Sequence, residues 1–269
     1  MSKIGERRDV GELYAFAQET IQQMGREALT FFSKDHHQRT VFDQDLVTQA
    51  DLHLNQSFNK IIADRYPKHQ AFGQGPLDEG YTHDAGRYLW VFDALDGVDN
   101  FQSGIPIWGM SIALYENYWP VLGLFFMPAT NDLFRACAGQ DAYWNDRRIQ
   151  MGNRGGISQE SLLLTFSRFH LFYNSQFPGK IRDFGSTGAH VCYVAMGRAD
   201  AAFIANESFK DLCAVSVIIE AAGGKLLKGD GSAFFLGDYL DGRRIDEHLM
   251  ITSPSNAQII LGSLSPARV

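Results

Sequence analysis

Two aspartates three residues apart carry the clearest chemical signal in this sequence. Asp93 and Asp96 follow the apolar run 88–92, and Gly97 comes directly after them. A strand over that run delivers Asp93 at its end, and a turn at Gly97 folds Asp96 back, so that both carboxylates can reach one Mg²⁺-sized ion. The same spacing occurs in polar turns, where Asp side chains accept hydrogen bonds from backbone N–H groups. On this window alone, the polar turn is the favoured interpretation.

Further polar blocks accompany this pair along most of the chain. They cover residues 45–51, 66–75, 185–188, 194–201 and 210–224. In this order and spacing, the blocks resemble the inositol monophosphatase family, which consists of Mg²⁺-dependent phosphomonoesterases of small phosphorylated polyols and related metabolites. The resemblance extends from about Val10 to Pro254. It implies a phosphatase that needs Mg²⁺.

Composition agrees with a globular enzyme. The chain has 269 residues, of which 45% are hydrophobic and 20% are charged, so we expect one domain over 1–269. A net charge of -7 argues against nucleic acid as the main partner, because binding to a phosphate backbone needs a basic surface. It does not argue against a small phosphorylated metabolite, since a bound cation can receive the phosphate.

The cysteines and the apolar stretches indicate the cellular setting. Cys137, Cys192 and Cys213 form no paired framework, which predicts reduced thiols in the cytoplasm. The N-terminus lacks an apolar signal run. The most apolar stretch, 121–129, is far shorter than the ~20 residues that span a bilayer. We therefore expect no membrane partner.

Hydrophobic periodicity predicts the elements that position the polar blocks. Asp9 and Glu12 form a capping box that opens a helix, and a second amphipathic helix covers 52–66 with Asp51 at its start. Residues 108–116 and 120–127 read as strands of a meander, and 162–166 as a further strand. Helices are expected over 185–196 and 211–222, the latter ending at Gly223. These elements predict an α+β fold, and the family resemblance implies a five-layered αβαβα sandwich.

The resemblance also implies roles for individual residues. Asp93, Asp96 and Asp211 match metal ligands of the family, and the backbone carbonyl of Leu95 adds a further ligand oxygen. The resemblance implies one to three bound Mg²⁺ ions. Where two ions are bound, Asp93 is expected to bridge them. Oxygen-only ligands of this kind suit Mg²⁺. The substrate-binding positions are Gly97, Gly185, Ser186 and Thr187, where N–H groups at the start of a helix bind the phosphate. The alternative interpretation of this loop is an ordinary helix N-cap at Ser186 without a role in binding. Homodimerisation is a further expectation from the family.

Two catalytic positions depart from the family pattern. Gln74 replaces a glutamate that ligates metal and helps to activate water, and its amide cannot accept a proton. Val98 replaces a threonine whose hydroxyl pairs with the aspartate matching Asp51 and positions the attacking water. Loss of a positioned base lowers rates by ~10²–10⁴. Asp78 or Glu79 could replace Gln74 as the group that activates water. The favoured interpretation of this pair is nevertheless a solvent-exposed turn.

Two positions that contact substrate in the family also differ from the family pattern. Lys210 replaces a tryptophan, and its ammonium can pair with Asp211 or take the place of a cation. Ile204 replaces the glutamate that contacts inositol in the family.

Two functions remain open. The first is an Mg²⁺-dependent phosphatase of a small phosphorylated polyol, sugar or nucleotide with weakened or redirected activity. The second is a pseudophosphatase that binds a phosphorylated ligand or a protein without turnover.

Overall fold

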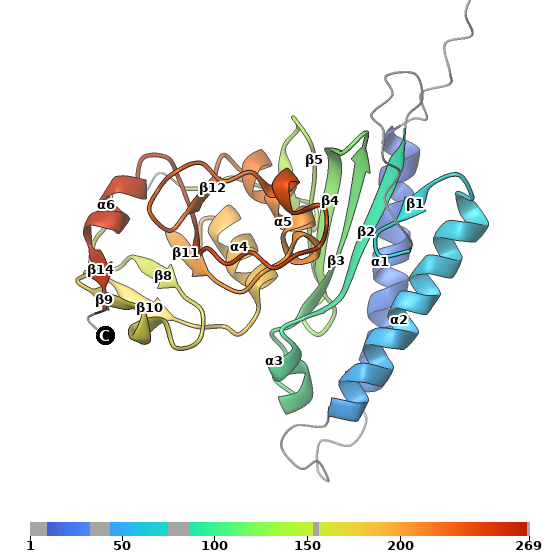
Figure 1. Ribbon diagram of the computed structural model, residues 1–269, viewed down its shortest axis with the longest axis horizontal. Coiled ribbons are helices and arrows are strands. Elements are labelled where there is room, and N and C mark those ends of the chain that lie inside the picture. Colours follow the sequence, from blue (N-terminus) through green and yellow to red (C-terminus); the bar gives the residue numbers. More distant parts are fainter. Residues whose placement is uncertain (1–9, 33–43, 75–86, 153–155, 268–269) are drawn as a thin grey trace, which may run out of the picture.

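Two long helices cover one face of a seven-stranded sheet (Figure 1). They are α1 (Val10–Phe32) and α2 (Gln44–Arg65). The computed structural model describes residues 10–32, 44–74, 87–152 and 156–267. The first helix has an apolar stripe that is buried from Leu13 to Ala28, and it packs against β4 of the sheet. Burial of one apolar stripe therefore fixes the outer layer.

The large sheet is a meander with a short parallel strand at one edge. Its strands lie in chain order, and every pair from β2 to β7 is antiparallel. Asn117 and Tyr118 have φ values of 50° and 66°, the left-handed conformation that suits a two-residue hairpin. The strands are β1 (Gln70–Ala71), β2 (Tyr88–Asp96), β3 (Gly109–Glu116), β4 (Trp119–Met127), β5 (Asp132–Cys137), β6 (Ala142–Trp144) and β7 (Arg147–Ile149).

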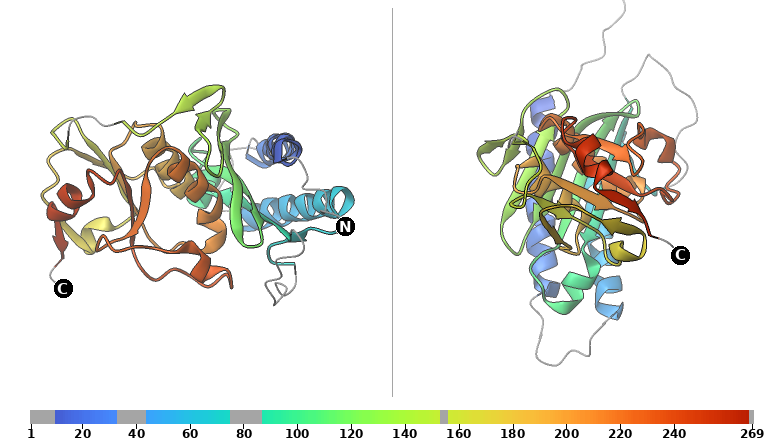
Figure 2. Two further views of the ribbon diagram at one scale, coloured as in Figure 1. Left: turned by 90° about the horizontal axis from the view of Figure 1, so that it is seen from above. Right: turned by 90° about the vertical axis from the view of Figure 1, so that its left-hand side faces the viewer.

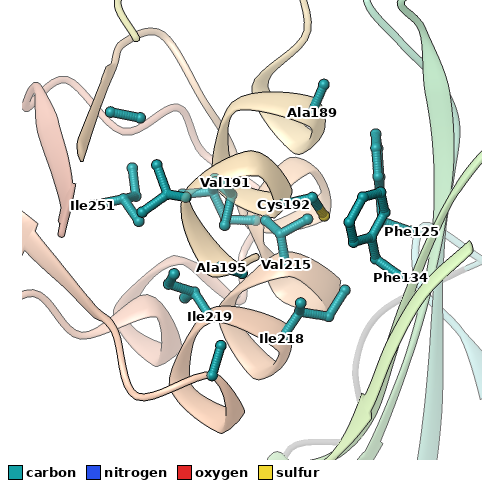
Figure 3. Close-up of a cluster of buried hydrophobic side chains, with 14 of the residues drawn as sticks. Phe125, Phe134, Ala189, Val191, Cys192, Ala195, Val215, Ile218, Ile219 and Ile251 are labelled. Carbon is teal, nitrogen blue, oxygen red and sulfur yellow. The ribbon is translucent and has the colours of Figure 1, made fainter. Parts of the chain in front are cut away.

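Two central helices separate this sheet from a second one. They are α4 (Thr187–Ala195) and α5 (Phe209–Ala221). Figure 3 shows side chains of both helices between Phe125 and Phe134 of the large sheet and Ile251 of the second sheet. The second sheet has the strand order β10 (Lys180–Arg182), β8 (Leu162–Leu164), β11 (Ala201–Ile204), β13 (Leu249–Thr252), β12 (Lys225–Lys228).

The fifth layer lies beyond the second sheet, as Figure 2 shows from above. It contains α6 (Ala257–Gly262), the 3-10 helix η1 (Phe169–Leu171) and the strand pair β9 (Tyr173–Ser175) and β14 (Leu264–Pro266). A short helix α3 (Val98–Ser103) and the 3-10 helix η2 (Leu236–Tyr239) complete the described elements. The layers follow the order αβαβα, which confirms the predicted α+β sandwich. No helix of the described ranges is long and apolar enough to cross a membrane.

Several predicted boundaries differ from the structure, and three of them concern an aspartate of the site. The second helix starts at Gln44, so Asp51 lies inside it instead of capping it, because buried Ala50 and Leu54 continue one apolar stripe. Strand β2 continues to Asp96 and pairs with β3 beyond the predicted end. Helix α5 starts at Phe209, two residues before Asp211. Tertiary pairing and packing extended each element past its local pattern.

Candidate active site

Strand β2 and the turn after it deliver the predicted aspartate pair. Asp93 lies opposite Ser111 and Asp96 opposite Gly109, with a register shift between them, and the side chain of Leu95 within this shift is buried. A bulge of this kind changes the direction in which side chains point. The strand therefore presents two carboxylates with different surroundings.

Gly97 brings this turn against the loop that precedes α4. Its φ is 83°, and a Cβ atom there would lie 3.0 Å from the carbonyl oxygen of Ile107 and 3.1 Å from that of Gly185. The side-chain amide of Asn100 donates to the carbonyl oxygens of Ile107 and Phe184, at 2.6 Å each. Left-handed backbone and close approach both require glycine at position 97. The two predicted substrate segments are thus held side by side.

Asp96 accepts hydrogen bonds from the start of α4, whose N-cap is Ser186, as the alternative interpretation predicted. Its Oδ2 atom accepts hydrogen bonds from the Ser186 hydroxyl and from the Gly188 N–H at 2.8 Å, and Oδ1 accepts from the Thr187 N–H at 3.1 Å. Burial raises the pKa of Asp96 to about 6, although the Ser186 hydroxyl and the Gly188 N–H oppose that shift. The N–H groups expected to meet a phosphate therefore meet a carboxylate of the chain itself.

Asp93 forms an ion pair with Lys210. The Nζ atom of Lys210 lies 2.9 Å from Oδ1 of Asp93, whose side chain is 6% exposed. The negative charge of Asp93 raises the pKa of Lys210 above its ordinary value, while burial opposes this. The lysine therefore stays protonated and pairs with Asp93. Of the two roles predicted for Lys210, pairing with Asp211 does not occur in the structure.

Asp211 stabilises the start of α5. Its Oδ2 atom accepts hydrogen bonds from the backbone N–H of Ser208 at 2.7 Å and from the Ser208 hydroxyl at 2.8 Å, which completes a capping box with that residue. Since each carboxylate oxygen can accept more than one hydrogen bond, these two bonds to Oδ2 leave Asp211 able to accept further donors. Its orientation is nevertheless set by the helix.

The remaining predicted catalytic positions lie on α2, at the start of α3 and after β1. Asp51 on α2 is close enough for its charge to contribute to the raised pKa of Lys210. Val98 is the first residue of α3 and is 36% exposed. Gln74 is exposed in the turn after β1. Asp78 and Glu79, the predicted rescue residues, lie outside the described residues, as does Gly75.

The arrangement does not fit Mg²⁺ as it stands. The donor type is right, because Asp93, Asp96 and Asp211 offer carboxylate oxygens. Across the described ranges, however, no three carboxylate, imidazole or thiol side chains are grouped so that they could share one ion. Asp93 faces an ammonium, Asp96 faces the start of α4, and Asp211 faces the start of α5. An ion beside Asp93 would meet the positive charge of Lys210.

A fifth carboxylate, which sequence reasoning missed, belongs to this site. Glu207 lies between β11 and α5, and its Oε1 atom accepts a hydrogen bond from the Thr187 hydroxyl at 2.7 Å. Burial raises the pKa of Glu207 well above its ordinary value, and the charges of Asp211, Asp96 and Asp93 act in the same direction. The available signal was its position four residues before Asp211 in a polar turn that links a buried strand to a helix.

A cavity of about 730 Å³ opens beside these segments. Its walls include Asp96, Gly97, Val98, Ser186, Thr187, Glu207 and Arg244. A cavity of this size accommodates a small metabolite. The guanidinium of Arg244 donates to the carbonyl oxygen of Asn206 at 2.6 Å, and no carboxylate in the described part of the chain forms an ion pair with it. This guanidinium can therefore meet an anionic group.

His190 of α4 predicts a pH dependence of stability. The ring is 2% exposed, and its Nε2 atom accepts the Phe184 N–H at 2.9 Å, which requires the neutral ring. Burial lowers its pKa from 6.5 to about 4. Between these values the unfolded chain binds more protons, so acidification favours unfolding, by up to about 3 kcal/mol from this residue. Urea denaturation from pH 7 to pH 4 measures the effect.

The comparison variant is His190→Gln, whose amide oxygen can still accept from Phe184. We expect the wild type to lose more stability than this variant as the pH falls, while His170→Gln, at an exposed histidine, behaves like the wild type. Parallel pH curves for the wild type and His190→Gln would contradict the prediction.

Comparison with known proteins identifies the family. The fold is a layered αβαβα sandwich, and the model of the inositol monophosphatase family matches residues 9–260. The chain belongs to the inositol monophosphatase family. Nus factor SuhB of Xylella fastidiosa is 30% identical over 236 residues, which are 83% of this chain and 79% of that protein. Inositol monophosphatase 2 of Saccharomyces cerevisiae is 30% identical over 205 residues, which are 69% and 70% of the two chains.

Solved structures agree with this fold. Inositol monophosphatase II of Staphylococcus aureus has a TM-score of 0.74 and 21% identity, covering 93% of this chain and 92% of that one. SaIMPase-II has been crystallised with 2′-AMP and with inositol monophosphate. The family is generally Mg²⁺-dependent, and its members include phosphatases.

Proposed function

We propose that this chain binds a small phosphorylated polyol, sugar or nucleotide metabolite in the cavity beside α4, and that Mg²⁺-dependent hydrolysis is lost. The observation that carries this proposal is the distance of 2.9 Å between Lys210 Nζ and Asp93 Oδ1. An ammonium beside the carboxylate that would bridge two ions supplies the positive charge that a metal supplies in relatives. The changes at Gln74 and Val98 remove the groups that would activate water.

Binding needs no metal in this proposal, because the protein supplies its own cations. Arg244 on the cavity wall has N–H groups beyond the one that bonds to Asn206. Guanidinium groups bind phosphate oxygens through charge-assisted hydrogen bonds. Lys210 reduces the negative charge around Asp93 at the same time. The residues of the chain thus bind and orient a phosphate without the step that cleaves it.

The test is calorimetric titration with a panel of sugar, polyol and nucleotide phosphates in the presence of a chelator, followed by an assay of phosphate release with Mg²⁺. We expect a member of the panel to bind without a divalent ion and to remain intact. Arg244→Gln should weaken that binding about tenfold, the effect of one charge-assisted hydrogen bond. Arg198→Gln, at another exposed arginine, should leave it unchanged. Binding that requires Mg²⁺ would contradict the proposal.

Weakened Mg²⁺-dependent hydrolysis is a second candidate, and the retention of four aspartates favours it. Asp51, Asp93, Asp96 and Asp211 keep the residue types that the family uses. In this case one or more ions would have to displace Lys210 from Asp93. Phosphate release that disappears in Asp93→Asn would establish this candidate and refute the first.

A further inference from the structure

Another cavity lies away from the candidate active site. Its volume is about 760 Å³, and its described lining residues include none of those that line the cavity beside α4. Helix α5 lies between β4 and β12 (Figure 1), and its second half contributes Ile219 and Glu220 to the wall. Asp211 precedes Glu220 by nine positions, which is about 14 Å of helix. A ligand in this cavity is therefore separate from one beside α4.

Aromatic rings dominate the wall of this cavity. Trp119 and Phe235, which are 71% and 68% exposed, are the two most exposed large apolar side chains of the described residues, and both line it. Tyr115, Tyr118 and Phe234 contribute three further rings. Small-molecule sites are typically concave, mostly apolar and roughly 300–1,000 Å³ in volume. The cavity has the size and the lining of such a site.

The hairpin that carries Trp119 has an unfavourable backbone conformation. Asn117 and Tyr118 form its two-residue loop, with φ values of 50° and 66°. Loops of this kind prefer Asn-Gly, because glycine adopts a positive φ without strain. A bulky residue at positive φ is an outlier, and such outliers cluster at ligand sites. Since Tyr118 also lines the cavity, the strain and the aromatic wall point to the same function.

The charges at this cavity do not suit a phosphate. Glu220, Lys225 and Asp238 are the charged residues of the described lining, and all three are exposed. Two carboxylates and one ammonium leave a net negative charge, which repels an anion. Exposed charges also contribute little to affinity. The aromatic rings, which favour stacked and edge-to-face contacts with other rings, therefore decide what binds.

We propose that this cavity binds a small molecule with an uncharged, flat aromatic or heteroaromatic ring system. The rings of Tyr118, Trp119 and Phe235 contact that ligand when it is bound. It differs in chemistry from the phosphorylated metabolite proposed for the cavity beside α4, so this inference does not depend on the proposed function.

The test compares 2-naphthol with decahydro-2-naphthol, which has the same carbon skeleton and hydroxyl but no aromatic ring. Each titration of the full chain is followed through the NMR signal of the Trp119 indole N–H, which the variant Trp119→Phe identifies. We expect 2-naphthol to shift this signal and to bind about threefold to tenfold more tightly than the saturated probe, the effect of aromatic contacts beyond buried area. The indole signals of Trp90 and Trp108, which are fully buried, should not move.

Two variants locate the contact, and a third is the control. Phe235→Leu, which stays apolar but loses the ring, should weaken 2-naphthol binding about threefold and reduce the preference for the aromatic probe. Tyr118→Gly should weaken it by a similar factor with a melting temperature at or above that of the wild type, because glycine adopts this φ without strain. Phe172→Leu, at an exposed phenylalanine outside the cavity, should bind as the wild type does.

Equal affinity of the wild type for the two probes overturns the inference, as does a Trp119 signal that neither probe shifts. Unchanged binding of 2-naphthol by Phe235→Leu overturns it too. If Tyr118→Gly binds less tightly but is also less stable than the wild type, Phe235→Leu decides the question. None of these results bears on phosphate binding beside α4, so the proposed function stands or falls on its own titration.

Discussion

The triple variant Gln74→Glu, Val98→Thr, Lys210→Trp is expected to release phosphate with Mg²⁺ about 10³-fold faster than the wild type. The first two changes restore the group that accepts a proton and the hydroxyl that positions water. A positioned base contributes ~10²–10⁴ in rate and an intact metal shell ~10–100, and such effects are not additive. The third change removes the ammonium 2.9 Å from Asp93. The measurement is kcat/KM over the metabolite panel at millimolar Mg²⁺.

The matched control for this prediction is the double variant Gln74→Glu, Val98→Thr. It restores the water-activating groups but keeps Lys210 on Asp93, so we expect activity close to that of the wild type. Adding Asp93→Asn to the triple variant should abolish the gain, which would locate it in this site. A double variant as active as the triple variant would show that Lys210 does not obstruct the metal.

Lys210→Met is expected to lower the free energy of unfolding by about 2 kcal/mol and to make stability depend on Mg²⁺. Removing one partner of a buried ion pair leaves the other charge unpaired, which costs roughly 3–5 kcal/mol in full burial. The lysine side chain is 36% exposed, so solvent screening reduces that figure. With Lys210 gone, Mg²⁺ can bind Asp93 and should raise Tm with concentration.

The readout is the melting temperature of wild type and variant over a Mg²⁺ titration. For the wild type we expect Tm to be independent of Mg²⁺. Lys225→Met, at an exposed lysine of β12, is the control and should match the wild type in both respects. A variant that is as stable as the wild type without Mg²⁺ would contradict a stabilising ion pair, and an equal response of all three proteins would contradict the exclusion of metal by Lys210.

The layers of the fold followed from local patterns, because their signals are short in range. The stripe from Leu13 to Ala28 and the meander around Asn117 each depend on residues a few positions apart. Element ends were less predictable. Asp51 looked like a helix cap, yet about two further turns of helix precede it, since packing of Ala50 extends the helix beyond the local cap signal.

The residue types of the site were predictable, but their partners were not. Asp93 and Lys210 are 117 positions apart in the sequence, and only the packing of α5 against the large sheet brings them to 2.9 Å. Glu207 had only its position before Asp211 as a signal, because its place in the site arises from contacts with Thr187 of α4 and with the backbone of Ile245. Contacts between residues far apart in the sequence produce no local spacing pattern from which they could be predicted.

The sequence by itself therefore determined the family, the order of the layers and the residue types of the candidate site: carboxylates at Asp93, Asp96 and Asp211, an amide at Gln74 and an apolar side chain at Val98. Tertiary structure alone decided which partners these side chains contact. It placed an ammonium on Asp93, turned Asp96 toward α4 and paired Glu207 with the Thr187 hydroxyl. The physical reason is that a buried charge takes the nearest partner in space, whatever its distance along the chain.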